Sequence, residues 1–513
     1  MQTKKMKENP RRGNGHSRFE DPRAGGRGLP ATGRSEKSRY RSCPLARSCG
    51  GCQLQDLEYQ DQLYWKQDGV EDVLGRFGRV APIIGMENPV HYRNKVQAVF
   101  GRDRGGRIIS GIYQPGTHRI VPVRDCMIED EIADKIIGTV RTLMKTFHID
   151  PYDEDSQLGC IRHVLVKRGF ASGQVMVVLV VGTPQIPSKA DFINILRQRH
   201  PEITTILLNF NDQRTSMVLG DEPEMVLYGP GYIEDRLCGL TFRISAKSFY
   251  QVNPVQTKVL YEIAMRMARL TGKESVIDAY CGTGTIGLVA ARNGAAQVLG
   301  IELNPDAVRD AVSNASLNGI ENVQFVCDDA SKYLKRLAAE KQHVDVVFLD
   351  PPRAGSDEQF LASLIRLAPD TVVYISCNPL TLERDLRYLL NFGSYEVRGI
   401  QPVDLFPYTE HVETVCLLSK LHSAQHIEIE LEMDELDLTT AESKGTYEEI
   451  KDYILEKYGV KVLLLYIAQI KQKHGIIERD CYNKAKNQKS KTPQCSPVKE
   501  KQIEEPLRHF KMI

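Results

Sequence analysis

One cysteine of this sequence stands where an apolar run ends and a helical pattern begins. Cys377 lies in "YISCNPLTLERDL" (374–386), directly before Asn378 and Pro379. Pro379 fixes the backbone of the turn, and the carboxyl end of a parallel strand is the edge at which ligands bind. Three interpretations are open for this thiol, namely a small core residue, a metal ligand or a nucleophile.

A glycine-containing turn between a predicted strand and a predicted helix offers a nucleotide site. In "VIDAYCGTGTIGL" (276–288), Gly282, Gly284 and Gly287 fit the G-x-G-x-x-G spacing, so a NAD-dependent oxidoreductase is one interpretation. The backbone can approach a ligand closely at such a turn, and the helix N-terminus offers unpaired N–H groups.

Three carboxylates that follow this turn favour S-adenosylmethionine over NAD. Glu302, Asp329 and Asp350 each end one of the next predicted strands, at the ligand edge of the sheet. We expect Glu302 to accept the ribose hydroxyls and Asp329, or its neighbour Asp328, to meet the adenine amine. The alternative is that these acids only cap helices.

The motif "DPPR" (350–353) narrows the chemistry. Methyltransferases that act on exocyclic amines tend to place an aromatic residue after the two prolines, where it stacks on the base. Arg353 occupies that position here and suits a phosphate or a base edge instead. An amine target is therefore disfavoured.

A thiol and a carboxylate at one sheet edge would suit methylation of carbon 5 of uracil. Addition of a thiolate to carbon 6 makes carbon 5 nucleophilic, and a base must later remove the carbon 5 proton. Cys377 suits the first role, and Glu413 in "YTEHVETV" (408–415) suits the second because it begins the final predicted strand. Glu410 and His411 are weaker candidates on the preceding loop. The cysteines predicted to be small core residues are Cys281, Cys327 and Cys416.

Three stretches, "LDPPRAG", "YISCNPLTLERDL" and "HVETV", resemble the RNA uridine-5-methyltransferases, which make 5-methyluridine in ribosomal or transfer RNA. The resemblance covers about 43–420. It implies Cys377 as nucleophile and Glu413 as proton-abstracting base, with RNA as the partner and ribosomal RNA favoured over transfer RNA. The residues it implies for binding S-adenosylmethionine are Gln251, Tyr280, Thr285, Glu302, Asp329 and Asp350. A non-catalytic RNA-binding protein with the same fold remains the alternative.

Four cysteines in the first part of this region have the spacing of a metal centre. Cys43, Cys49 and Cys52 follow a C-x5-C-x2-C pattern, and Cys126 is far downstream, with Cys160 as a rival fourth ligand. Two pairs of thiols would suggest zinc, whereas three close thiols and one distant thiol fit a cubane cluster better. The resemblance also points to a [4Fe–4S] cluster that organises the RNA-binding region rather than performing redox chemistry.

Composition and pattern divide the 513 residues into five segments. Residues 1–42 are predicted to be a disordered basic arm, since 1–47 hold 13 Lys and Arg against 4 acids. The predicted core has three parts: a cluster and RNA-binding region (43–127), a β-rich α+β region (128–244) and an α/β, Rossmann-like methyltransferase domain (245–421). The last segment, 422–513, is predicted to be an accessory extension. It is an acidic linker, with seven acids in 426–442, followed by a basic helical segment that we hypothesise to contact nucleic acid.

The sequence predicts a cytoplasmic monomer without a membrane span. Its longest useful apolar run, "VMVVLVVG" (175–182), has the length of a strand. Twelve cysteines without a secretory signal indicate a reducing compartment. Larger members of the resembled family often carry a small β-barrel before the cysteines, where only 42 residues precede Cys43 here. RNA affinity is therefore expected from the arm, the β-rich middle and the extension.

Overall fold

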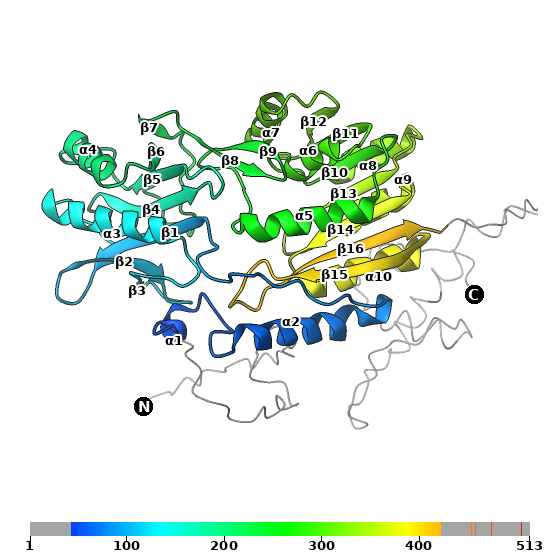
Figure 1. Cartoon of the computed structure of the whole chain (residues 1–513), viewed down its shortest axis with the longest axis horizontal. Helices are drawn as coiled ribbons and strands as arrows, with labels where there is room; N and C mark the ends of the chain where they lie inside the picture. The colour runs from blue at the N-terminus through cyan, green and yellow to red at the C-terminus, as the bar shows by residue number, and fades with distance from the viewer. Residues whose placement is uncertain (1–42, 422–452, 454–456, 458–472, 474–503, 505–513) are drawn as a thin grey trace, which may run out of the picture. The chain divides into compact units, whose positions relative to one another are not determined.

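A computed structural model describes residues 43–421 and the single positions 453, 457, 473 and 504 (Figure 1). The predicted basic arm lies outside the described residues, as does the predicted extension apart from those four positions. The helices are α1 (Ala46–Cys49), α2 (Tyr59–Leu74), α3 (Glu131–Thr146), α4 (Lys189–Arg199), α5 (Pro254–Ala268), α6 (Thr285–Arg292), α7 (Pro305–Leu317), α8 (Ala330–Ala339), α9 (Glu358–Leu367) and α10 (Pro379–Phe392). The strands are β1 (Lys95–Arg102), β2 (Ile108–Tyr113), β3 (Ile120–Pro122), β4 (Ile161–Arg168), β5 (Val175–Val181), β6 (Ile203–Phe210), β7 (Met225–Tyr228), β8 (Ile233–Leu237), β9 (Leu240–Ile244), β10 (Ser275–Ala279), β11 (Gln297–Glu302), β12 (Val323–Cys327), β13 (Val346–Leu349), β14 (Thr371–Ser376), β15 (Tyr395–Val403) and β16 (Glu413–Lys420).

The C-terminal half of the described chain contains a seven-stranded sheet in the order β12-β11-β10-β13-β14-β16-β15. Strands β10 to β14 are parallel, and β16 is inserted antiparallel between β14 and β15. The chain order reverses between β10 and β13, which is where ligands bind in such sheets. The predicted α/β fold with a Rossmann-like sheet is confirmed.

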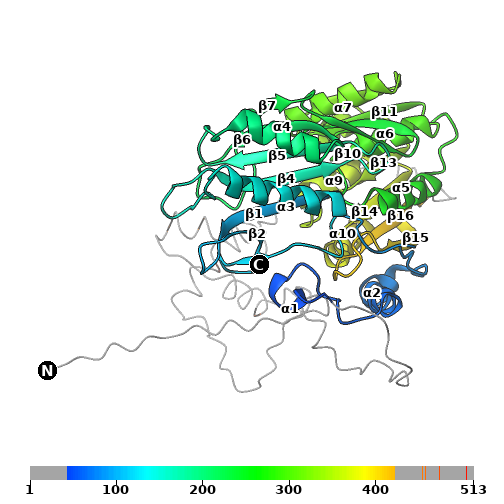
Figure 2. The ribbon, with the colours of Figure 1, turned by 60° about the vertical axis from the view of Figure 1, so that its left-hand side comes forward.

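Helices cover both faces of this sheet (Figures 1 and 2). One apolar cluster joins the sheet to α5 and α6 through residues such as Leu260 and Leu288. A second cluster on the other face contains Phe360 of α9, Leu386 of α10 and Val70 of α2. Both faces are buried, which explains why the strands read as continuous apolar runs in the sequence.

The N-terminal half contains a second seven-stranded sheet in the order β3-β2-β1-β4-β5-β6-β7. It is antiparallel except for the pair β5 and β6, which α4 connects. α3 and α4 pack on one face, and the other face shares the apolar cluster of α5. Because β1 pairs with β4, this sheet runs across the division predicted at 127/128. Within the part of the chain that the structure describes, no helix is long and apolar enough to cross a bilayer.

Candidate active site

Cys377 and Glu413 meet because β14 and β16 are antiparallel neighbours. The last registered pair of their ladder is Ser376 and Thr414, so the residue after one strand faces the residue that begins the other. Asn378 then caps α10, and its side chain accepts a hydrogen bond from the Leu380 N–H at 3.1 Å. Adjacent strands lie about 5 Å apart, which brings the thiol and the carboxyl group to one point of the sheet edge.

The two groups lie in a buried setting that disfavours negative charge. Burial raises the pKa of the half-buried Cys377 thiol to about 12, and the charges of Glu413 and Asp350 contribute. The pKa of Glu413, which is only 4% exposed, is raised well above its usual value by burial and by Asp350. Burial also raises the pKa of Asp350 to about 7. Arg353 is the cation that opposes these shifts at Cys377 and Glu413.

Arg353 also binds a histidine that the sequence interpretation set aside as a loop residue. Its guanidinium lies 3.1 Å from Nδ1 of His411. Burial and the neighbouring cations Arg353 and Lys66 lower the pKa of His411 to about 4, so the ring is neutral and accepts from Arg353. The pair stands between the "DPPR" loop and the strand that carries Glu413. His411 lies on a loop two residues before Glu413, and no local pattern in the sequence predicts its contact with Arg353.

A buried carboxylate holds the "DPPR" loop in place. Asp385, on α10, is fully buried and accepts hydrogen bonds from the Tyr374 hydroxyl at 2.6 Å and the Ser356 N–H at 2.8 Å. The Arg353 carbonyl in turn accepts from the Thr381 hydroxyl at 3.3 Å. Helix α10 therefore fixes both the loop that carries Arg353 and the turn that carries Cys377.

The glycine turn and the acid at the end of β11 form a second part of the same edge. Oε2 of Glu302 accepts a hydrogen bond from the Gly282 N–H at 3.0 Å. Gly282 has a φ of +54°, and a Cβ there would meet no atom within 4 Å, so the turn faces open space. Tyr280 has a φ of +65°, which is strained for a bulky residue. Thr285, the first residue of α6, shares a hydrogen bond with the Tyr261 hydroxyl at 3.0 Å.

Asp278, inside β10, is a buried acid that the sequence interpretation missed. Its Oδ2 accepts from the Gly287 N–H at 2.7 Å, while its buried Oδ1 has no hydrogen-bond partner among the described residues. Burial raises its pKa to about 8, and Asp350 and Glu302 add to the shift. A charged residue inside the apolar run "VIDAY" was the available signal. Such an orphaned acceptor suits a cationic ligand group.

The remaining predicted donor-site residues differ in their settings. Asp329 is the N-cap of α8, where its side chain accepts a hydrogen bond from the Lys332 N–H at 2.9 Å. This contact agrees with the alternative interpretation that the acid caps a helix. Its neighbour Asp328 lies 3.6 Å from Arg336. Gln251 is half-buried, and its carbonyl accepts from the Asn94 side chain at 3.2 Å. It therefore joins the N-terminal sheet to the start of α5.

Two of the three cysteines predicted to be core residues are buried, namely Cys281 and Cys416. The prediction is wrong for Cys327, which is exposed at the end of β12. β12 is the edge strand of the sheet, so its last residue has a neighbouring strand on one side only.

The structure brings together the four cysteines predicted to bind a metal. Cys43, Cys49 and Cys52 are half-buried, and so is Cys126. Cys52 and Cys126 pack against the same small apolar cluster, which includes Tyr92. Burial raises the pKa of Cys49, and it raises that of Cys52 to about 11, with the charge of Cys43 adding to both shifts. Burial raises the pKa of Cys126 too, and Cys52 contributes.

The distances between the sulfur atoms bear on the choice between zinc and a cluster, and the location of Cys160 bears on the choice of the fourth ligand. Zinc bound to four thiolates at about 2.3 Å would hold the sulfur atoms about 3.8 Å apart. Among the described residues, three metal-ligating atoms lie within 4.8 Å of one another only at the exposed His343 and the half-buried Asp345 and Asp370, and not at the cysteines. The four thiols are thus spread more widely than a zinc tetrahedron. The rival ligand Cys160 is buried in another apolar cluster, where its thiol faces the Gln185 carbonyl at 3.5 Å.

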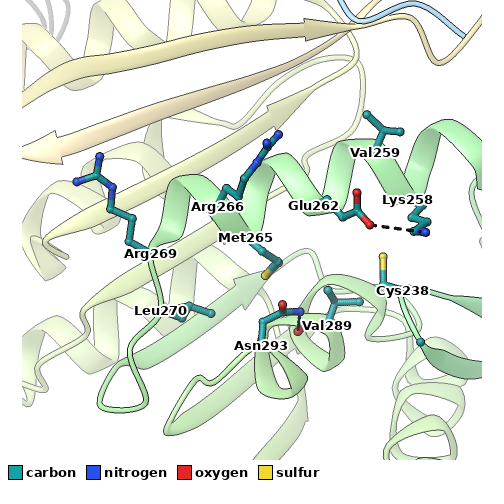
Figure 3. Close-up of a pocket in the computed structure, with 11 residues that line it drawn as sticks. Cys238, Lys258, Val259, Glu262, Met265, Arg266, Arg269, Leu270, Val289 and Asn293 are labelled. Carbon is teal, nitrogen blue, oxygen red and sulfur yellow. Dashed lines mark hydrogen bonds and ion pairs between the residues drawn. The ribbon is translucent and has the colours of Figure 1, made fainter.

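A pocket of about 660 Å³ lies apart from these sites, between α5, α6 and the turn after β8 (Figure 3). Met265, Val289 and Asn293 line it. Lys258 and Glu262, whose charged groups lie 3.8 Å apart, also line it. None of the residues predicted to act in catalysis, donor binding or metal binding contributes to its lining.

Comparison with known proteins gives consistent matches. The pattern of the family "tRNA (Uracil-5-)-methyltransferase" matches residues 231–421. An uncharacterized RNA methyltransferase of Halalkalibacterium halodurans is 46% identical over 73% of this chain and 82% of its own length. An uncharacterized RNA methyltransferase of Caldanaerobacter subterraneus subsp. tengcongensis is 44% identical over 75% of this chain and 86% of its own length. The structure of Pyrococcus abyssi tRNA (uracil-54, C5)-methyltransferase with S-adenosyl-L-homocysteine aligns with a TM-score of 0.61 at 25% identity, covering 74% of this chain and 87% of that one.

Proposed function

Because this chain belongs to the RNA (uracil-5-)methyltransferase family, we propose that it methylates carbon 5 of a uridine through a covalent bond between Cys377 and carbon 6. It is an RNA methyltransferase that uses S-adenosylmethionine, which sets the NAD interpretation aside. The observation that supports the covalent route best is the strand register that sets Cys377 opposite Glu413.

The proposed reaction has three steps. The Cys377 thiolate adds to carbon 6, and the electron pair of the 5,6 double bond moves to give an enolate across carbon 5 and the carbon 4 oxygen. Carbon 5 attacks the methyl carbon of the sulfonium, whose carbon–sulfur bond breaks to release S-adenosylhomocysteine. Glu413 then takes the proton from carbon 5, the double bond forms again, and the Cys377 thiolate leaves.

The charges around Cys377 set the conditions for this route. Two neighbouring carboxyl groups oppose the thiolate, so their ionisation must be limited while it forms. Burial raises the proton affinity of both Asp350 and Glu413, and Asp350 raises that of Glu413 further, so we expect the pair to hold a proton near neutral pH. Arg353 favours the thiolate at Cys377.

The donor would occupy the edge formed by the glycine turn and the strand-end acids. Gln251, Tyr280, Thr285, Glu302, Asp329 and Asp350 are the residues we propose for it, to which the geometry adds Asp278. The unpartnered Oδ1 of Asp278 suits the ammonium group of the donor. When bound, the donor supplies the electrophilic methyl group.

The RNA substrate was predicted to be ribosomal RNA, and this stays a prediction. The matching family and the Pyrococcus abyssi protein are both named for transfer RNA. Transfer RNA is therefore the second candidate. Mass mapping of 5-methyluridine in both RNA classes from a deletion strain, with and without the restored gene, would decide between them.

We also propose that Cys43, Cys49, Cys52 and Cys126 hold a [4Fe–4S] cluster. Four thiolates could hold either group, but their spacing, which is wider than a zinc tetrahedron would hold them, supports the cluster over zinc. Its role would be structural, because it would tie the first residues of the described chain to the N-terminal sheet.

The covalent route is tested with Glu413→Gln. This variant should add Cys377 to the RNA and methylate carbon 5 once, but it should not eliminate, so a protein–RNA adduct should persist on a denaturing gel. Glu410→Gln, three residues earlier, is the matched control and should release its product. Absence of an adduct in Glu413→Gln, with tritium from labelled S-adenosylmethionine still reaching free RNA, would assign the base elsewhere.

A further inference from the structure

The loop that leads into Glu413 is held along its whole first half by residues distant in sequence. It connects β15 to β16 and is formed by residues 404–412. Each carbonyl from 404 to 408 accepts a hydrogen bond. The donors, in that order, are Gln256 at 3.0 Å, Asn253 at 2.9 Å, Lys66 at 3.0 Å, Tyr92 at 2.9 Å and the Leu54 N–H at 3.0 Å.

The end of this series is a strained residue. Tyr408 has a φ of +68°, a conformation that bulky side chains adopt only when the surroundings impose it. Its N–H donates to Oε1 of Gln62 at 2.8 Å, while its carbonyl accepts from Leu54. Both partners come from the segment around α2. The strain at Tyr408 is therefore held by that segment and not by the loop itself.

An ion pair at the start of the loop comes from the same helix. Nζ of Lys66 lies 2.6 Å from Oδ1 of Asp404, and both side chains are completely buried. The Tyr59 hydroxyl donates to the other oxygen of Asp404 at 2.9 Å. A buried pair gives little net stability over an apolar pair, but it specifies one arrangement of α2 against the loop.

We propose that Gln62 and Lys66 are positioning residues, which hold loop 404–412 in the one conformation that presents Glu413 to the Cys377 adduct. This inference rests on the proposed function, because it assumes that Glu413 removes the carbon 5 proton. α2 contacts β15, the strand that ends where this loop begins, and it also contacts α10 (Figures 1 and 2). Val403 at the end of β15 pairs with Glu413, so a shift of this helix would displace the base.

The proposal separates two steps of the reaction. Addition and methyl transfer need Cys377 and the donor, which β14, α10 and the glycine turn hold. Elimination needs Glu413, which begins β16 directly after the clamped loop. A displaced base slows elimination by about 10- to 100-fold for a shift of about 1 Å. A role in folding alone would reduce the amount of active enzyme and lower all steps together.

The test uses the full chain with unmethylated RNA and labelled S-adenosylmethionine. Gln62→Met removes the acceptor for Tyr408, and the double variant Lys66→Met with Asp404→Asn removes the pair without leaving a buried charge. Lys258→Met is the matched control, because its partner Glu262 and Lys258 itself are both exposed on α5. Each protein is assayed for one round of methyl transfer, for turnover, for adduct on a denaturing gel and for melting temperature.

We expect both test variants to complete the first methyl transfer at nearly the normal rate, to lose about 10- to 100-fold in turnover and to accumulate adduct. Lys258→Met should match the unmodified protein. Equal losses in the first transfer and in turnover without adduct, or unchanged turnover, would overturn the proposal. If the double variant does not fold, Gln62→Met alone decides. If Glu413→Gln itself gives no adduct, the proposed role of Glu413 as the base fails, and that outcome is distinct from failure of the clamp.

Discussion

Cys377 and Glu413 lie directly opposite each other at the end of the ladder between β14 and β16, one position beyond the registered pair of Ser376 and Thr414. The relationship depends on an inserted antiparallel strand, since β13, the other neighbour of β14 in the sheet, is parallel to it. A thiol and a carboxyl group from two separate strands are thereby brought to one point of the sheet edge.

The identity of the nucleophile can be tested against a second cysteine at the same sheet edge. Cys377→Ser should reduce methyl transfer by on the order of 10³-fold or more, because a hydroxyl is a far weaker nucleophile than a thiolate. Cys327→Ser should leave the rate unchanged, since Cys327 is exposed at the end of the edge strand β12. The rate is measured as tritium transferred to RNA. Full activity in Cys377→Ser would remove the covalent mechanism.

The rate of methyl transfer in a single turnover should rise with pH. The pKa of Cys377 is raised to about 12, so the thiol is protonated at neutral pH and loses its proton as pH increases. Below that pKa the thiolate fraction grows about tenfold for each pH unit. Ionisation of Asp350 and Glu413 over the same range opposes the thiolate, because both negative charges raise the pKa of Cys377, so the rise in rate should be shallower than about tenfold for each pH unit. A flat or falling rate between about pH 7 and about pH 9 would contradict this.

The affinity for S-adenosylmethionine should depend on Glu302. This carboxylate accepts from the Gly282 N–H at 3.0 Å and the Asn304 N–H at 2.8 Å, so it orders the glycine turn in addition to any contact with the donor. Glu302→Gln should weaken binding by about tenfold, the cost of losing charged hydrogen bonds. Calorimetry measures the dissociation constant. The exposed Glu340→Gln is the control, and equal affinity in both variants would disprove the role of Glu302.

The proposed cluster should be lost when Cys126 is replaced and retained when Cys160 is replaced. Cys126→Ser removes a proposed ligand that packs against the same apolar cluster as Cys52, so the protein purified without oxygen should lose its bound iron and its visible absorption. Cys160→Ser should retain both, because Cys160 packs in a separate cluster. Iron, sulfide and zinc are measured on both variants. Stoichiometric zinc in the unmodified protein would refute the cluster.

Much of the candidate site was accessible from the sequence because its residues follow local rules. Strand, turn and helix alternate along 276–386, and the acids stand where strands end, so Glu302, Asp350 and Cys377 could be assigned to one edge without knowing any distance. The local sequence pattern gave a wrong or missing prediction where the role of a residue depends on whether its side chain is buried. Cys327 is exposed because β12 is an edge strand, and Asp278 was overlooked because its functional character is an unpartnered buried oxygen.

The sequence by itself determined the chemistry that is available: one thiol at a strand end, acids at the neighbouring ends and a set of clustered cysteines. Only the tertiary structure decided which groups meet. It inserted β16 beside β14, brought Cys126 to Cys52 and set Lys66 against Asp404 across 338 positions of the chain. The physical reason is that register, burial and charge are set by contacts between distant segments, whereas a sequence pattern reports only the neighbours along the backbone.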